Sequence, residues 1–269
     1  MTSAFSFTAC LLYLMATIVM IRSLRVEPAR GKHAAVDLLL IYLAVIAHVL
    51  SLSPSVLLNE TPDLALGTTL SLISLLAMLL FLLARLFQPI HSLGIFIYPA
   101  ALAGALIGWL APGPAYASNL GGALGLLHVA GAGLAYALIS LAFAQALLVH
   151  AYDRSLKHPH TAGNWHSLPP IQTMERVLFQ LIYLGFGLLT ITLISGALSA
   201  DKMFGEAFLF NHHTVLALLA WISLAGLLAG RIFLGWRGRT AVLWTGAGFT
   251  LMALGYFGTR FVLEVLLGT

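Results

Sequence analysis

The chain has 269 residues, of which 60% are hydrophobic and only 8% are charged, and its mean hydropathy is +0.98. Because a soluble domain has about a quarter of its residues charged, this composition excludes an ordinary soluble globular protein. The net charge of +4 does not indicate nucleic-acid binding, because the basic residues lie in short connections between apolar runs, as the orientation of membrane helices requires.

Eight apolar runs are long enough to cross a bilayer, which takes about 20 residues per helix. They cover residues 4–21, 36–54, 68–88, 92–112, 121–150, 177–199, 213–234 and 241–265. The first run is interpreted as a retained span rather than a secretory signal, because its basic residues, from Arg22 on, follow it instead of preceding it. The sequence therefore predicts an all-α, polytopic membrane helix bundle of eight transmembrane helices, forming a single integral membrane domain over residues 1–269.

The basic residues predict the orientation of this bundle. If the N-terminus is outside, 11 of the 13 lysine and arginine residues fall on the inner side, and the other two are Lys202 and Arg260. This asymmetry follows the positive-inside rule and places both termini on the outer (periplasmic) side. The longest connection, 151–176, is then a polar, proline-broken inner loop.

Histidines from three predicted spans fall in the same outer half of the bundle. His48 lies about six residues before Pro54, His128 about seven residues below the outer start of its span, and His212 and His213 at the outer end of theirs. The other histidines fall at the inner surface or in the inner loop: His33, His91, His150, His158, His160 and His166. A single histidine in a membrane helix is usually explained by a hydrogen bond to a neighbouring helix, whereas several at one depth indicate a shared ligand or a proton path.

Two imidazoles on facing helices can bind haem iron from both sides. A structural zinc site is excluded, because Cys10 is the only cysteine and does not accompany these histidines. Arg260, near the outer end of the last span, has two interpretations: an ion pair with Glu264 one turn later, or a bidentate contact to an anionic group such as a haem propionate.

Two groups of glycines, within residues 121–133 and 246–258, also have two interpretations. Small residues at such spacings let helix backbones approach closely, or they leave a flat slot for a planar ligand. The motifs of hydrolases, nucleotide-binding enzymes and zinc proteases do not occur, so an enzyme with an active site built from its own side chains is not predicted.

The C-terminal part of the chain, 121–265, resembles the YpjD branch of the cytochrome c assembly membrane-protein family, which is related to CcsA, CcmC and HemX. The first stretches that carry the resemblance are His128-Val129, Ala135-Tyr136-Ala137-Leu138, Gln145-Ala146-Leu147 and residues 169–176. The last helices add residues 212–221, 235–239 and 248–258. Residues 1–120 match mainly in topology and in the placement of His48.

This resemblance implies a haem-handling protein of the bacterial inner (cytoplasmic) membrane that holds haem b through histidines near the outer face. His128 matches the family position of an outer haem-ligating histidine, and His212 also matches a histidine, whereas His213 replaces a lysine of the pattern. The tryptophan-rich outer segment of CcsA and CcmC is missing from residues 200–211, so haem binding is implied more strongly than haem ligation to an apocytochrome, and no enzyme activity is predicted.

The candidate haem ligands are therefore His48, His128, His212 and His213, with Arg260 as the propionate partner. The expected partners are haem, membrane lipid and another membrane protein of cytochrome c maturation, and not nucleic acid. The alternative is a transporter or regulatory subunit in which the outer histidines form a proton or cation site.

Overall fold

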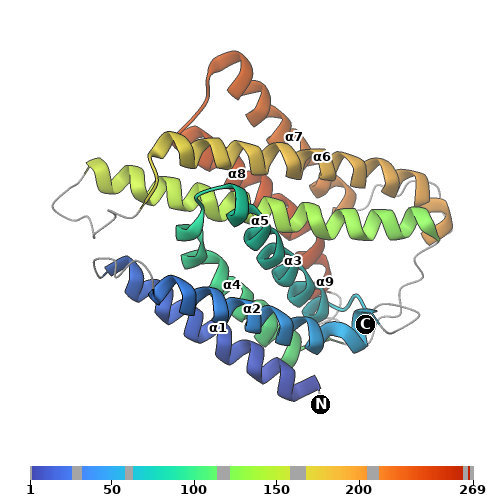
Figure 1. Ribbon diagram of the computed structural model, residues 1–269. Coiled ribbons are helices and arrows are strands. Elements are labelled where there is room, and N and C mark those ends of the chain that lie inside the picture. The colour runs from blue at the N-terminus through green and yellow to red at the C-terminus, as the bar shows by residue number, and fades with distance from the viewer. Residues whose placement is uncertain are drawn as a thin grey trace. The chain divides into compact units, whose positions relative to one another are not determined.

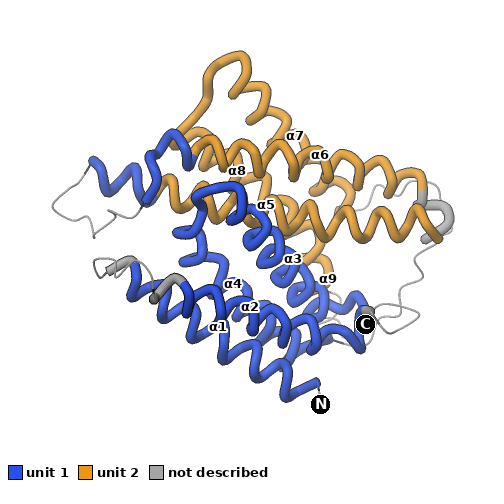
Figure 2. Tube along the Cα trace, in the orientation of Figure 1, with its two compact units in different colours: residues 1–116, 151–174 blue, residues 117–150, 175–269 orange. Residues whose placement is uncertain are grey.

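A computed structural model describes residues 2–25, 32–57, 63–113, 122–157, 168–204, 212–262 and 266. The regular elements of these residues are helices, and eight of the helical segments are long and apolar enough to cross a membrane (Figure 1). This confirms the all-α class and the predicted number of spans. The chain divides into two compact units, residues 1–116 with 151–174 and residues 117–150 with 175–269 (Figure 2).

Unit 1 contains the first four spans. They are formed by α1 (Thr2–Arg25), α2 (Lys32–Leu52) with the π-helical turn η1 (Ser53–Leu57), α3 (Leu66–Phe87), and the short 3₁₀ turn η2 (His91–Leu93) with α4 (Gly94–Leu110). α1 packs against α2 and α4, and α3 packs against α4. The α3–α4 contact is close because Gly108 faces Ser71, where an added Cβ would lie 2.5 Å from the serine Cβ.

Unit 2 contains the last four spans. Most of α5 (Ala123–Lys157) and α6 (Ile171–Phe204) belongs to it, followed by α7 (His212–Leu234). The last span consists of α8 (Arg239–Ala253), the π-helical turn η3 (Leu254–Gly258) and α9 (Thr259–Phe261). Gly248 and Gly255 of this span face α7, where added Cβ atoms would meet Leu224 and Leu216 at 2.8 and 3.3 Å. These glycines therefore serve close helix packing.

The helices next to the predicted inner loop are longer than expected, and the loop boundaries 151–176 are wrong. α5 continues to Lys157, whose Nζ lies 2.6 Å from Asp153 Oδ2 one turn earlier, so charged residues extend the helix beyond the apolar run. α6 begins at Ile171, directly after Pro170, whose carbonyl accepts the amide of Thr173 at 2.9 Å. Proline is well tolerated at a helix start, where its missing N–H is not needed. α6 also reaches Phe204, into the predicted outer loop.

Candidate functional site

His128 on α5 has a fixed orientation. Its Nδ1 lies 2.9 Å from the backbone oxygen of Thr192 on α6, and because a carbonyl only accepts, Nδ1 carries the proton. The lone pair of this imidazole is therefore on Nε2. One turn further along α6, Gly196 leaves room for the ring, since an added Cβ would lie 2.7 Å from His128 Cε1. A hydrogen bond from one ring nitrogen to a backbone oxygen is the usual support for a histidine that binds metal through the other.

His213 lies at the start of α7, half-buried, and His212 before it is exposed. His128, His212 and Arg260 all lie close enough to His213 to act on it electrostatically. Unit 2 thus brings together four of the five candidate residues named from the sequence, supplied by α5, α7 and α9.

Tyr256, in the π-helical turn η3, links the members of this group. Its ring lies edge-on to His213, with centroids 6.2 Å apart, and the guanidinium carbon of Arg260 is 5.9 Å from the Tyr256 ring centroid. Tyr136 on α5 also contacts Tyr256, at 6.2 Å, and Phe257, at 5.6 Å, between ring centroids. The group therefore combines imidazoles, aromatic rings and one permanent positive charge. Glu264, the other partner considered for Arg260, lies outside the described residues.

This donor set fits haem better than a bare metal ion. Within the described part of the chain, no group of three or more His, Cys, Asp or Glu side chains is arranged to hold a metal. A bare ion would need such a group, whereas haem iron already has its four porphyrin nitrogens and takes only axial ligands from the protein. The imidazole of His128, with Nε2 as acceptor, would be able to hold haem iron, and the guanidinium of Arg260 would be able to bind the carboxylate of a propionate.

His48 belongs to unit 1 and has a different environment. It is fully buried, its Nδ1 lies 3.3 Å from the Tyr13 hydroxyl, and its Nε2 lies 2.9 Å from the Ser71 hydroxyl. Both ring nitrogens therefore already have partners within the unit, on α1 and α3. This is the arrangement of a hydrogen-bonded core histidine.

The remaining histidines do not join the group in unit 2. His150 is half-buried near the end of α5, and His91 lies in unit 1. The side chain of His33, like His158, His160 and His166, lies outside the described residues.

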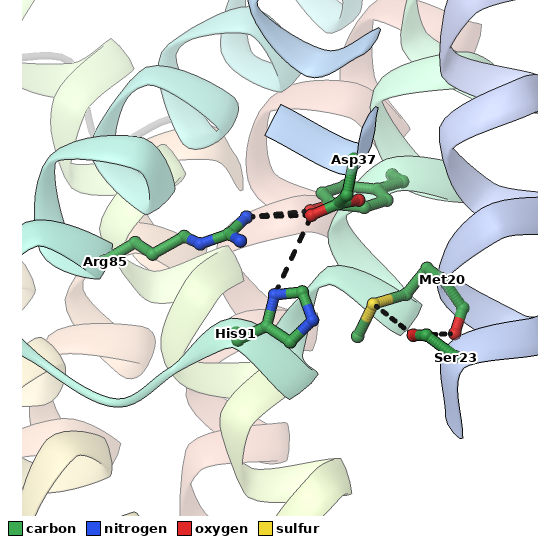
Figure 3. Close-up of polar contacts among 6 residues, drawn as sticks. Met20, Ser23, Asp37, Arg85 and His91 are labelled. Atoms are coloured by element: carbon green, nitrogen blue, oxygen red, sulfur yellow. Dashed lines mark hydrogen bonds and ion pairs between the residues drawn. The ribbon is translucent and has the colours of Figure 1, made fainter. Parts of the chain in front are cut away.

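Unit 1 contains a buried ionic cluster that was not predicted from the sequence (Figure 3). Asp37 on α2 is 2% exposed, and its Oδ2 lies 3.1 Å from Arg85 Nη1 on α3 and accepts a hydrogen bond from the Tyr98 hydroxyl on α4 at 3.2 Å. His91 Nδ1 is 3.8 Å from the same oxygen. The available signal was a pair of opposite charges inside the apolar ends of neighbouring predicted spans. It was overlooked because Arg85 was counted only among the basic residues that predict the orientation, and Asp37 was not considered.

Comparisons with known proteins show which family the sequence matches. The model of the family described as cytochrome C assembly protein matches residues 36–267. The inner membrane protein YpjD of Escherichia coli K12 is 28% identical over 231 residues, which cover 83% of this chain and 85% of that protein. The cytochrome c biogenesis protein CcsA of a Synechococcus species is 34% identical over 98 residues, 36% of this chain and 28% of that protein. No solved structure matches the chain.

Proposed function

Since this chain belongs to the cytochrome C assembly protein family, we propose that it is a multi-pass membrane protein that holds haem through histidines of unit 2. The observation that carries the proposal is the fixed tautomer of His128 beside a second imidazole and an arginine. His128, through Nε2, and either His213 or His212 would hold the haem iron. Arg260 would neutralise a haem propionate.

The hydrogen bonds favour these ligands over His48. To bind iron, His48 would have to give up Tyr13 or Ser71 and leave a buried hydroxyl without its partner, which costs about 1–3 kcal/mol. His128 needs no such exchange, because its hydrogen bond uses the nitrogen that faces away from the ligand. His48 therefore contributes to the packing of unit 1.

The chemistry that haem brings to such a site is limited by its ligands. Two imidazole ligands would leave the iron no open position, so the residues of this chain would retain or release haem b rather than activate a substrate at it. We accordingly propose a role in holding or passing haem, without an enzymatic step of its own.

The location and partners follow from the relatives. A chain of eight apolar helices with a relative named as an inner membrane protein fits the bacterial inner membrane. The positive-inside rule supports a location of His128, His213 and Arg260 in the outer half of that membrane. The likeness to proteins of cytochrome c biogenesis supports a further membrane protein of cytochrome c maturation as the partner that exchanges haem with this chain.

The test is the visible spectrum of the protein purified in detergent from haem-replete cells. We expect reduced-minus-oxidised bands of bis-imidazole haem b, and a pyridine haemochrome assay that gives haem in stoichiometric amount. His128→Ala should lose this haem, whereas His150→Ala, a half-buried histidine of the same helix, should retain it. A colourless wild-type protein, or equal haem content in both variants, would overturn the proposal and make proton or cation flux in proteoliposomes the next measurement.

A further inference from the structure

The last membrane span changes its hydrogen-bonding pattern within unit 2. It is α-helical over Arg239–Ala253, π-helical over Leu254–Gly258 and α-helical again over Thr259–Phe261. A π turn uses bonds five residues apart, is rare, and usually occurs as a single turn within an α-helix. Tyr256 lies inside this turn and Arg260 two residues after its end, so both of these residues of the candidate site are affected by the change.

A side chain from another helix explains the π turn. The hydroxyl of Tyr136 on α5 donates to the carbonyl oxygen of Met252 at 2.7 Å and forms a second hydrogen bond with the backbone of Tyr256, whose only backbone donor is its N–H. Met252 and Tyr256 are four residues apart and would bond to each other in an α-helix. The hydroxyl thus stands between the two groups, and such an insertion is a recognised cause of helix distortion.

The π turn determines which way the following residues face. One extra residue in a helix rotates everything beyond it by about 100°, because each residue turns an α-helix by that angle. In the observed register, Tyr256 meets the ring of His213, and Arg260 lies over Tyr256. Without the π turn, Arg260 would point about 100° away from this direction.

We propose that Tyr136 is a positioning residue of the haem site, whose hydroxyl holds the π turn and thereby directs Tyr256 and Arg260 toward His213. The inference rests on the proposed function and assigns Tyr136 no contact with haem itself. Its ring packing against Tyr256 and Phe257 does not require the hydroxyl. Tyr136→Phe therefore removes the proposed action and keeps the packing.

The first measurement does not involve haem. Backbone hydrogen exchange of the peptide covering residues 252–261 should change in Tyr136→Phe, because the hydrogen bonds of the π turn are rearranged. Tyr183→Phe is the matched control, since Tyr183 is 47% exposed on α6 of the same unit. Unchanged exchange in Tyr136→Phe would show that the hydroxyl does not hold the turn and would overturn the inference.

The second measurement is a double-mutant cycle on haem affinity with Arg260→Gln. We expect Tyr136→Phe to weaken haem binding about tenfold in the wild-type background and to have little further effect when Arg260 is already replaced, since coupled residues are non-additive. Fully additive effects, or an affinity equal to that of Tyr183→Phe, would refute the positioning role. A wild-type protein that binds no haem would instead refute the proposed function, and the exchange measurement would still decide whether Tyr136 holds the turn.

Discussion

Replacing Gly196 by alanine tests the orientation of His128 without touching the histidine. The new Cβ would lie 2.7 Å from His128 Cε1 and 2.9 Å from Nδ1, whereas ordinary contact begins at 3.4 Å. The ring must therefore move away from α6 by about 0.7 Å, the difference between 3.4 and 2.7 Å. Thr192 lies one turn earlier on the same face of α6, so this movement also separates Nδ1 from its acceptor.

The size of the effect follows from that hydrogen bond. Lengthened from 2.9 Å by a similar amount, the Nδ1–H···O contact would be about 3.6 Å and would no longer count as a hydrogen bond. The tautomer and ring direction would then be lost, and changes in such supporting contacts typically reduce metal affinity by about 10- to 100-fold. We expect a loss of haem affinity in this range for Gly196→Ala.

Gly187→Ala is the matched control for this prediction. Gly187 lies on the same helix, and nothing would lie within 4 Å of its added Cβ. Both substitutions replace a helical glycine, so the gain in helix propensity of up to about 1 kcal/mol is common to them. Titration of haem into the apoprotein, followed by visible absorption, should show weaker binding for Gly196→Ala only. Equal affinities would refute the clamped orientation of His128.

Two further predictions concern Arg260 and the Asp37–Arg85 pair. Arg260→Gln should weaken haem binding about tenfold, because a hydrogen bond to a charged group contributes about 1.5–3 kcal/mol. Haem dimethyl ester lacks the propionate charges and should bind the wild type and the variant equally, so a difference that persists with the ester would contradict the propionate contact. Asp37→Ala should lower the free energy of unfolding in detergent by about 3 kcal/mol, because Arg85 loses its buried partner. Asp153→Ala removes the exposed pair with Lys157 and should lower the free energy of unfolding by less than about 1 kcal/mol. Similar losses of unfolding free energy in Asp37→Ala and Asp153→Ala would contradict a larger contribution from the buried pair.

Hydropathy was sufficient to predict the fold class and the number of spans, because a bilayer requires long apolar helices whatever their neighbours. It was insufficient at the helix ends. Residues 151–157 are polar and were predicted to belong to the connection, yet α5 continues through them to Lys157, where Asp153 and Lys157 pair on one helix face. Hydropathy therefore predicts which residues can lie in the membrane, and does not predict the residue at which a helix ends.

The sequence predicted which residues of the candidate site lie at a similar depth, and not how their side chains are directed. Depth along each span groups His128, His213 and Arg260, and the structure brings these three together in unit 2. The direction in which Arg260 faces could not be predicted, because it depends on a π turn caused by a hydroxyl 116 residues earlier in the chain. The Asp37–Arg85 pair was missed because Arg85 was used only to predict the orientation and Asp37, on a different predicted span, was not considered as its partner.

His48 and His128 are predicted at a similar depth in the membrane, and this depth does not predict their hydrogen-bond partners. The sequence places both in the same half of the membrane, and each has a hydrogen bond at Nδ1. For His128 the partner is a carbonyl, which can only accept, so the proton is fixed on Nδ1 and Nε2 keeps a lone pair for iron. For His48 the partner is the Tyr13 hydroxyl, which can donate or accept, and Ser71 already occupies Nε2. The chemistry of the partner atom therefore favours His128 over His48 as the proposed haem ligand.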